Sequence, residues 1–222
     1  MKGIIVLSLF VVVNAFAQPS KVASTNAAGG IWQIPFASTG NTISMSIQNN
    51  SAIEANNVSV TFYNIPAWIT FKTNTGIIKS VTANASQDAE FTFSVDKKAP
   101  VGKDTTLTAT IKTSDGQIWT KEIKVVVAAP KDYKLYNNFP NPFNPSTKIA
   151  FELPKASHVN LTIYDIVGRE VAQVADAEYP AGYTELTWNG TSKNGPMVAS
   201  GVYFYRVSTD RWSKVKKMLM VK

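Results

Sequence analysis

The sequence predicts an all-β protein, with two consecutive β-sandwich domains behind an N-terminal signal peptide. Three observations predict this fold class. Apolar and polar residues alternate with a period of two along most of the chain, which is typical of half-buried antiparallel strands. Clusters of Gly, Asn and Asp separate these runs, as tight turns between strands require. After residue 17 no segment shows sustained helical periodicity. The 222 residues are enough for one large domain or two small ones.

Residues 1–17 are predicted to be a signal peptide. Lys2 provides a positive start, and an apolar run over residues 4–13 follows it. Ala15 and Ala17 form the small-x-small pattern that signal peptidase requires, so Gln18 is the predicted first residue of the mature chain. The apolar run is much shorter than the ~20 residues that a membrane-spanning helix needs. We therefore expect export to the periplasm rather than a membrane anchor.

Residues 18–29 are interpreted as a lead segment, and residues 30–128 as the first sandwich. Five runs each place apolar residues on one face of a strand: Ile43, Met45 and Ile47; Val58, Val60 and Phe62; Phe91, Phe93 and Val95; Leu107, Ala109 and Ile111; and Trp119, Ile123, Val125 and Val127. Asp115-Gly116 separates the last two runs and predicts a hairpin turn.

Residues 129–134 are predicted to be a linker, and residues 135–222 a second, smaller sandwich. Residues 138–145 read N-F-P-N-P-F-N-P, and prolines cannot donate to a strand ladder, so this segment is expected to be irregular or at an edge. Strand alternation resumes in four runs: Ile149, Phe151 and Leu153; Val159, Leu161 and Ile163; Leu186 and Trp188; and Tyr203, Tyr205 and Val207. Turns are predicted at residues 165–168, 189–190 and 194–195.

The absence of Cys excludes disulfides, thiolate metal centres and a cysteine nucleophile. The chain has one His, so His158 is the only candidate for a serine–histidine relay. It precedes a predicted strand in a segment of small residues, and we interpret it as a solvated turn histidine. No calcium-loop, phosphate-loop or nucleophile-elbow motif occurs. We therefore expect neither a metal nor a cofactor.

Two pairs of acidic residues have the side chains that glycosidase chemistry uses, since it needs two carboxyl groups on either side of a sugar bond. They are Asp88 with Glu90 and Asp176 with Glu178. Both pairs are expected in turns or at strand ends, without the apolar pocket that would raise one carboxyl pKa. They are interpreted as surface acids, and the chain is expected not to be an enzyme.

The formal net charge of +7 is concentrated in the second half of the chain. Near the C-terminus a cluster of basic residues is accompanied by a single acid, Asp210; the basic residues are Arg206, Arg211, Lys214, Lys216, Lys217 and Lys222. A charged edge strand that blocks sheet-to-sheet aggregation is the favoured interpretation. Attraction to anionic lipopolysaccharide or to an acidic face of the export machinery stays open. Nucleic acid is not an expected partner.

Five sequence pieces and a basic, apolar terminal strand give residues 135–222 a specific resemblance. The pieces are F-P-N-P-F-N-P-S-T at 139–147, Y-D-I-V-G-R at 164–169, P-A-G-Y at 180–183, W-N-G at 188–190 and A-S-G-V-Y-F-Y-R at 199–206. This region resembles the type A C-terminal sorting domain of bacterial type IX secretion substrates, an Ig-like fold related to a flagellar hook-capping domain. One departure is Asn189, where that family often has Asp.

The resemblance implies an order of partners for the chain. The general secretion machinery and signal peptidase act first, and then the type IX translocon and a sortase act on the C-terminal domain. Cleavage is expected in the linker, within residues 128–133, and lipopolysaccharide or polysaccharide is an open further partner. The motif residues that the resemblance singles out are Pro140, Asn141, Pro142, Phe143, Asp165, Gly168, Arg169, Gly201, Tyr203 and Lys217.

Physical roles can be assigned to some of these motif residues. Gly168 and Gly201 are expected to permit turns. Arg169 is expected to contact a carboxylate, which its fork-shaped guanidinium can bind through two hydrogen bonds. Tyr203 and its neighbour Tyr205 are expected to fill the core or a partner's groove. The competing interpretation is that all of these residues only build the sandwich.

The first domain has a weaker resemblance, through three segments: residues 49–60, 66–68 and 91–102. They resemble Ig-like modules attached to secreted bacterial glycosidases and surface proteins, which space, support or bind. Trp68 and Trp119 are expected to pack in the core. Of the three, Trp32 is the one most suited to exposure and is the candidate contact for a carbohydrate ligand, although core packing is the favoured interpretation.

The sequence therefore favours an exported, non-enzymatic protein of the bacterial surface or medium, whose C-terminal domain directs secretion by the type IX route. Two alternatives stay open. One is a carbohydrate- or adhesion-type binding module with the same export domain. The other is a structural assembly protein that keeps its C-terminal domain.

Overall fold

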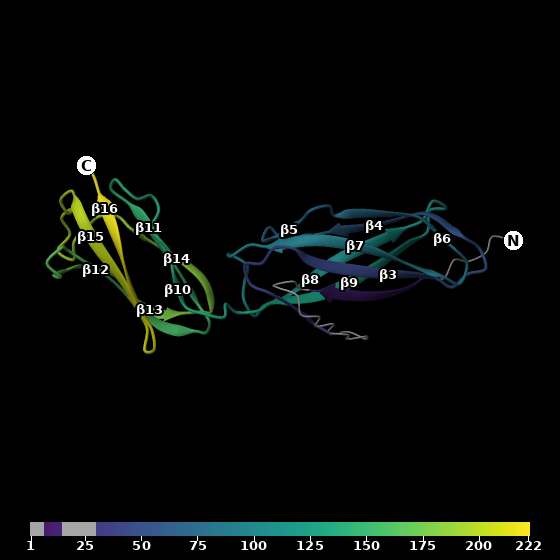
Figure 1. Cartoon of the computed structure of the whole chain (residues 1–222), viewed down its shortest axis with the longest axis horizontal. Helices are drawn as coiled ribbons and strands as arrows, with labels where there is room; N and C mark the ends of the chain where they lie inside the picture. Colours follow the sequence, from purple (N-terminus) through teal and green to yellow (C-terminus); the bar gives the residue numbers. More distant parts are fainter. Residues whose placement is uncertain (1–6, 15–29) are drawn as a thin grey trace. The chain divides into compact units, whose positions relative to one another are not determined.

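The computed structural model describes residues 7–14 and 30–222, and every helix or strand within them is a β-strand. The chain divides into two compact units, one ending at Ala128 and the other spanning Ala129–Lys222 (Figure 1). The predicted all-β sandwich fold is confirmed. Within the described ranges, no helix has the length and apolar character that crossing a membrane would require.

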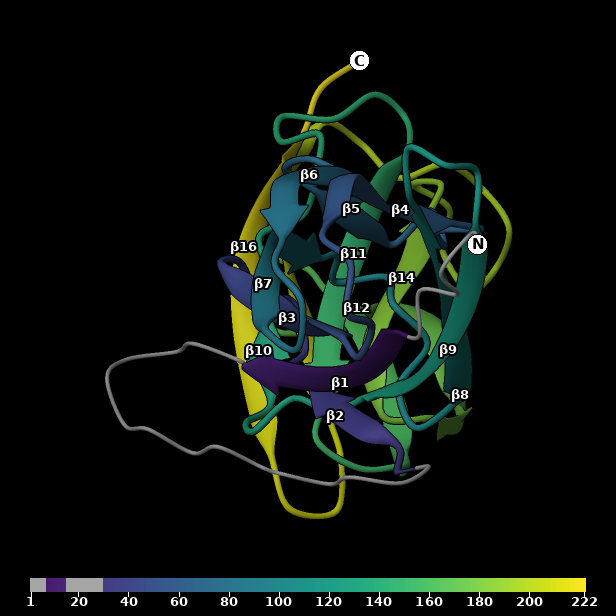
Figure 2. The same ribbon diagram turned by 90° about the vertical axis from the view of Figure 1, so that its right-hand side faces the viewer.

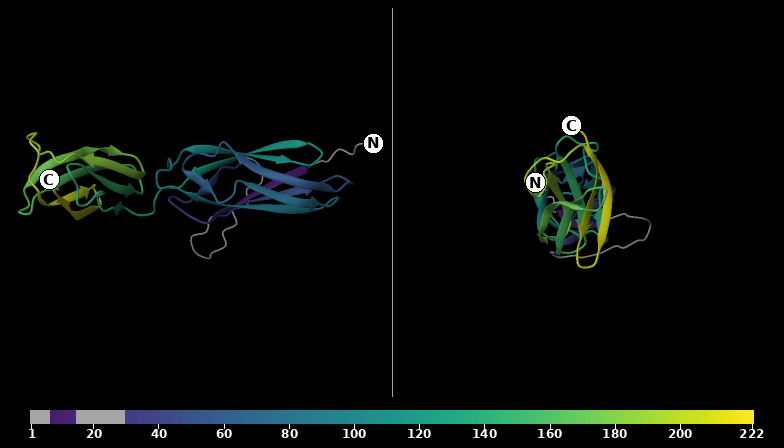
Figure 3. Two further views of the ribbon diagram at one scale, coloured as in Figure 1. Left: turned by 90° about the horizontal axis from the view of Figure 1, so that it is seen from above. Right: turned by 90° about the vertical axis from the view of Figure 1, so that its left-hand side faces the viewer.

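The first unit consists of two sheets (Figure 3). The first sheet has the order β1-β3-β7-β5 and is antiparallel throughout; its strands are β1 (Leu7–Asn14), β3 (Asn41–Asn49), β7 (Ser86–Val95) and β5 (Ile69–Phe71). The second has the order β2-β9-β8-β4-β6; its strands are β2 (Trp32–Ile34), β9 (Ile118–Val127), β8 (Asp104–Lys112), β4 (Ala55–Tyr63) and β6 (Thr75–Val81). In this sheet β2 runs parallel to β9.

The inward faces of these sheets form the core that the alternation predicts. On β3 the side chains of Ile43, Met45 and Ile47 have no exposed surface. Phe62 of β4 stacks on Phe71 with ring centroids 4.8 Å apart. Each fully buried aliphatic or aromatic side chain of this kind contributes about 1.5–3 kcal/mol through burial alone. The first sandwich is therefore held together by matched faces of strands far apart in sequence.

Trp32 packs in the core, which is the interpretation that the sequence favours over a carbohydrate contact. It is only 9% exposed and belongs to the buried core. The reason is that Trp32 lies in β2 opposite Val125 of β9, and shares its inward face with the fully buried Ile34. Trp68 and Trp119 pack partly buried against the same core. Trp32 is therefore a packing residue and not a platform for a sugar ring.

The predicted signal peptide is described in part. Its residues 7–14 form β1, which pairs with β3 at the edge of the first sheet (Figure 2). Ala15, Ala17 and Gln18, which define the predicted cleavage site, lie outside the described residues.

The second unit is a smaller sandwich of two antiparallel sheets. One has the order β10-β11-β14; its strands are β10 (Lys134–Leu135), β11 (Thr147–Leu153) and β14 (Gly182–Trp188). The other has the order β13-β12-β15-β16; its strands are β13 (Glu170–Tyr179), β12 (Ser157–Tyr164), β15 (Gly201–Ser208) and β16 (Ser213–Met220). The predicted inward residues of β11, β12 and β15 are all buried. The strand β16 lies at one edge of its sheet and carries three residues of the basic cluster, Lys214, Lys216 and Lys217.

Candidate functional site

The proline-rich segment 138–145 lies against β16, although about eighty residues separate them in sequence. The backbone N–H of Phe143 donates to the carbonyl of Leu219 at 3.0 Å, and the N–H of Val221 donates to the carbonyl of Phe143 at 3.0 Å. The side-chain oxygen of Asn141 accepts from the N–H of Leu219 at 2.9 Å. The structure therefore joins the motif residues Asn141 and Phe143 to the C-terminal strand.

The first half of the same segment is fixed by a small polar network. Asn138 is buried, and its side-chain amide donates to the carbonyl of Pro140 at 3.0 Å and to the hydroxyl of Thr147 at 2.9 Å. Its backbone N–H donates to the hydroxyl of Tyr205 at 3.0 Å. That hydroxyl donates onward to the carbonyl of Tyr136 at 2.8 Å. Burial raises the pKa of Tyr205 to about 12, as expected for a phenol taken out of water.

The W-N-G piece packs under the same segment. Trp188 is 3% exposed, and its ring lies 5.6 Å from the ring of Phe143. Gly190 has φ +75, and a Cβ at this position would lie 2.7 Å from the carbonyl oxygen of Pro145. Only glycine fits this close approach without moving the backbone. Three of the motif pieces therefore meet at one end of the second sandwich.

The strand β16 has one face in the core and one face in solvent. Met218 and Met220 have no exposed surface, whereas Val215, Lys217 and Leu219 alternate with them on the outside and are all exposed. Val215 is 50% exposed and Leu219 38%. A strip of two apolar side chains with a lysine between them therefore lies on the outer face of an edge strand, where a partner can reach it.

The strip continues onto the neighbouring strands of the same sheet. Lys217 lies opposite Phe204 of β15, and Val215 lies opposite Arg206. The guanidinium of Arg206 stands 5.0 Å from the ring centre of Tyr164 on β12. A cation over an aromatic ring is weakly attracted by it. The outer face therefore combines positive charge with partly exposed aromatic surface.

Asp165, Gly168 and Arg169 form the tight turn between β12 and β13. One carboxylate oxygen of Asp165 accepts from the backbone N–H groups of Val167 at 3.0 Å and Arg169 at 2.9 Å. Its other oxygen accepts from Nε of Arg169 at 2.7 Å. Despite an opposing contribution from desolvation, these hydrogen bonds hold the pKa of Asp165 below its usual value. Arg169 thus meets a carboxylate, as predicted, but that carboxylate belongs to its own turn.

Gly201 differs from its expected role, and the position of Tyr203 decides between the two roles expected for it. Gly201 begins β15 and is not in the left-handed region of backbone conformation, so the expectation that it permits a turn is wrong. The aromatic ring of Tyr203 lies 3.9 Å from the position that a Cβ of Gly201 would take. Tyr203 itself is 8% exposed, and its hydroxyl donates to the carbonyl of Ala199 at 2.8 Å. Tyr203 and Tyr205 therefore both fill the core.

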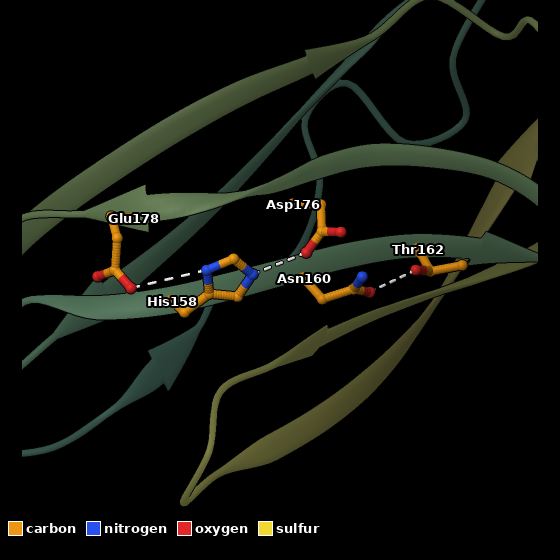
Figure 4. Close-up of polar contacts among 5 residues, drawn as sticks. All are labelled: His158, Asn160, Thr162, Asp176 and Glu178. Atoms are coloured by element: carbon orange, nitrogen blue, oxygen red, sulfur yellow. Dashed lines mark hydrogen bonds and ion pairs between the residues drawn. The ribbon is translucent and has the colours of Figure 1, made fainter.

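His158 lies in β12 rather than in a turn, so that part of the sequence prediction is wrong. Asp176 lies within β13 and Glu178 near its end, and both carboxylates lie beside His158. The other acidic pair, Asp88 and Glu90, lies within β7, so the expectation of turns or strand ends holds only for Glu178. Nε2 of His158 is 2.8 Å from Oδ1 of Asp176, and Nδ1 is 3.6 Å from Oε1 of Glu178 (Figure 4). The hydrogen bond with Asp176 raises the pKa of His158 and lowers that of Asp176. Sequence alternation could not reveal this cluster, because it depends on the register between two strands.

The His158 cluster is solvated, as predicted. Half of the His158 side chain is exposed, and so are most of the carboxylates around it. The hydroxyl of the adjacent Ser157 donates to the carbonyl of Lys155 rather than to the imidazole. Among the described residues, no group of His, Asp and Glu is arranged to hold a metal ion.

Comparison with known proteins agrees with the fold of the second unit. Residues 137–212 match the family model of the FlgD Ig-like domain. No curated protein matches the chain. The fold and this match together define a two-domain, all-β protein with an Ig-like second domain.

Several solved structures are similar to the chain at low identity. Dimeric latent PorU from Porphyromonas gingivalis has 18% identity and a TM-score of 0.35 over 99% of this chain, which spans 20% of that protein. A protein of unknown function from Porphyromonas gingivalis W83 has 11% identity and a TM-score of 0.33, covering 96% of this chain and 97% of that one. The CupB2 chaperone of Pseudomonas aeruginosa has 12% identity and a TM-score of 0.28, covering 87% and 99%.

Proposed function

We propose that the chain is an exported, non-enzymatic bacterial protein whose second domain directs its secretion across the outer membrane by the type IX route. In this proposal the first domain is the cargo that reaches the cell surface or the medium. The second domain is read by the type IX translocon and is then removed by a sortase. Signal peptidase acts earlier, between Ala17 and Gln18.

One observation supports the proposal most directly. The segment 138–145, the W-N-G piece and β16 contact each other at one end of the second sandwich. Each of them belongs to the sequence pattern that resembles a type IX sorting domain. Their packing leaves Val215, Lys217 and Leu219 on the outer face of an edge strand. An apolar and basic strip of this kind is suited to a partner with an apolar groove and acidic rim.

The linker has the features that a cleavage site needs. The backbone N–H of Ala128 donates to the carbonyl of Ile34 at 2.9 Å, which ties Ala128 to the first unit. Tyr133 stacks on Trp212 of the second unit with ring centroids 5.4 Å apart. Between these two anchors Lys131 and Asp132 are exposed. We therefore propose cleavage within residues 129–132, at the exposed Lys131 and Asp132 that follow the buried Pro130, because proteases need an accessible segment.

Mass spectrometry of the termini tests this proposal. The protein is recovered from medium and cell surface, and its terminal peptides and intact mass are measured. We expect a start at Gln18 and an end within residues 129–132. Exported protein that retains Lys222 would contradict removal of the second domain and would favour the structural assembly alternative. In a parallel experiment, we expect that a chain lacking residues 129–222 is not secreted.

A matched pair of variants tests whether the strip on β16 is read by a partner. Lys217→Glu reverses an exposed charge on the strip, and Lys121→Glu makes the same change on β9 of the first unit. We expect Lys217→Glu to reduce the secreted amount and accumulate the chain in the periplasm, with an unchanged unfolding temperature. Lys121→Glu should be secreted normally. Equal secretion of the two variants would show that no partner recognises the charge of Lys217.

The carbohydrate-binding alternative loses its candidate contact. Trp32 is the candidate contact for a sugar, and it is buried in the core of the first unit. The other two tryptophans of that unit, Trp68 and Trp119, pack against the same core.

A further inference from the structure

The outer edge of β3 is covered by a strand that the proposed function removes. Eight consecutive residues of β1 pair with β3, from Leu7 opposite Asn49 to Asn14 opposite Thr42 (Figure 2). All of β1 lies within the predicted signal peptide, residues 1–17. This inference therefore rests on the proposed export: once residues 1–17 are removed, β3 becomes the last strand on that side of its sheet among the residues that the structure describes.

The strand β3 lacks the features that normally protect an edge. It is nine residues long and reads N-T-I-S-M-S-I-Q-N, without a charge, a proline or a glycine. By contrast, β2, β5 and β10, which end their sheets, have only two or three residues. The other terminal strands, β6, β13, β14 and β16, all contain Lys or Glu. Long, flat, uncharged edges recruit another strand, so the uncovered β3 is suited to pair with one.

The sequence of β3 is nearly the same when it is read backwards. If two copies pair antiparallel about a two-fold axis at Met45, Ile43 of one copy lies opposite Ile47 of the other. In the same register Ser44 lies opposite Ser46, and Asn41 lies opposite Asn49. The one departure places Thr42 opposite Gln48, and both are polar. A strand that matches itself in this way meets the requirement of a two-fold interface, in which the same surface is used on both copies.

The two faces of the strand also match across such a pair. Ile43, Met45 and Ile47 are fully buried on the inward face, whereas Ser44 and Ser46 are half-buried on the outward face. Pairing would therefore extend the apolar face of one sheet into that of the other and place serines opposite serines, which can hydrogen-bond across strands. No charge lies on β3 to oppose this contact.

Acidic groups on the next strand are too distant to prevent it. Asp88 and Glu90 of β7 lie opposite Ser46 and Ser44. In the paired sheet, β7 of one copy would lie three strand spacings from β7 of the other, roughly 14 Å at about 4.7 Å per spacing. That separation exceeds the screening length of about 8 Å at physiological salt.

We propose that the exported chain forms a two-fold symmetric dimer through β3, with one sheet continuous across both copies. The partner is therefore a second copy of this chain. The vacated edge of the first unit is the interface, and Met45 lies at the symmetry axis.

Charge-swap variants of the chain produced from Gln18 test the interface. Multi-angle light scattering should give about twice the chain mass for the unaltered protein. The double variant Ser44→Lys/Ser46→Lys would place lysine opposite lysine at two positions across the interface. Ser44→Glu/Ser46→Glu would do the same with glutamate. Within each chain these glutamates also lie opposite Glu90 and Asp88 of β7, so this variant is compared only at temperatures where its thermal unfolding shows it folded. Like charges directly opposite each other destabilise a strand pair, and we expect each variant alone to dimerise at least about tenfold more weakly. A mixture of the two variants should restore the dimer.

The control carries the same two lysines on the other sheet. Thr108→Lys/Thr110→Lys alters two half-buried positions with the same spacing on β8, one of them opposite Glu122, and this variant should remain dimeric. Circular dichroism and thermal unfolding of all variants show that the monomers are folded. A dimer that survives both charged variants, or is lost equally in the control, would overturn the assignment to β3.

Cysteine cross-linking tests the register. Because the chain contains no Cys, each introduced thiol is the only one. A mixture of Ser44→Cys and Ser46→Cys chains should form a disulfide-linked dimer, since these positions lie opposite each other. Either variant alone should cross-link poorly, because identical positions are diagonal neighbours about 7–8 Å apart, beyond ordinary disulfide reach.

Monomeric behaviour of the chain from Gln18, with normal unfolding, would overturn the proposal and would mean that the edge is covered otherwise. This result does not depend on signal processing, because the tested chain already begins at Gln18. Processing is read separately from the N-terminal peptide of the exported protein, so failure of the proposed export and failure of the dimer are distinguishable.

Discussion

The hydroxyl of Tyr205 is expected to be the most important single polar group for the second domain. It accepts the N–H of Asn138 at 3.0 Å and donates to the carbonyl of Tyr136 at 2.8 Å, and the side chain has no exposed surface. Tyr205→Phe keeps the ring and creates no cavity, so its effect isolates these two bonds. Each bond contributes about 0.5–1.5 kcal/mol net, and a buried donor that loses its partner costs about 1–3 kcal/mol.

The expected loss of stability is therefore about 2–4 kcal/mol, which corresponds to a fall of at least about 8 °C in the unfolding temperature of a domain of this size. Calorimetry of the chain produced from Gln18 measures it, because the two units can unfold separately. Tyr203→Phe is the control, since it removes one bond, to the carbonyl of Ala199, from the same strand. The reasoning is refuted if Tyr205→Phe costs no more than Tyr203→Phe.

Three further predictions concern a pKa, a glycine and the core. The hydrogen bond with Asp176 raises the pKa of His158 in the folded state. Its contribution to the stability of the folded state is therefore complete below the ordinary imidazole pKa, and it is lost as the pH rises through the pKa of the folded state. NMR titration should give a midpoint above ~6.5, and Asp176→Asn should lower it; an unchanged midpoint would contradict the ion pair. Gly190→Ala should destabilise the second domain by at least about 2 kcal/mol, since a Cβ there lies 2.7 Å from a backbone oxygen, whereas Gly195→Ala in open space should cost about 1 kcal/mol. Similar losses would show that the close approach is unimportant. Trp32→Ala should destabilise the first domain by about 3–5 kcal/mol, and full stability with lost retention on a polysaccharide would contradict its burial.

Local alternation was sufficient to predict most of the fold. On β3 and β8 the side chains that alternate in sequence are the ones that are buried, because a strand presents successive residues to opposite faces. Trp32 shares parity with Ile34, but β2 has only three residues, which is too short for a pattern to be read. The sequence alone therefore left a carbohydrate role for Trp32 open beside core packing.

The candidate site was less accessible to sequence reasoning, because its contacts join distant segments. Nothing in the local sequence links Asn141 to Leu219, and their hydrogen bond depends on the return of β16 beside residues 138–145. His158 became a member of an ion-pair cluster only through the register of β12 against β13. The resemblance of the motifs identified Asn141 and the terminal strand but not His158, and the physical chemistry of the sequence could not bring the contacting segments together.

The dependence of residues 138–145 on β16 has a consequence for the timing of folding. The ribosome makes β16 after every other strand of the second unit, yet this strand supplies the backbone partners of Phe143 and the buried Met218 and Met220. A nascent or truncated chain that lacks residues 213–221 cannot close this end of the sandwich. The outer strip on β16 and the completed core therefore arise together. A chain that displays this strip has been synthesised through β16, so recognition of the strip would also verify that the second sandwich is closed.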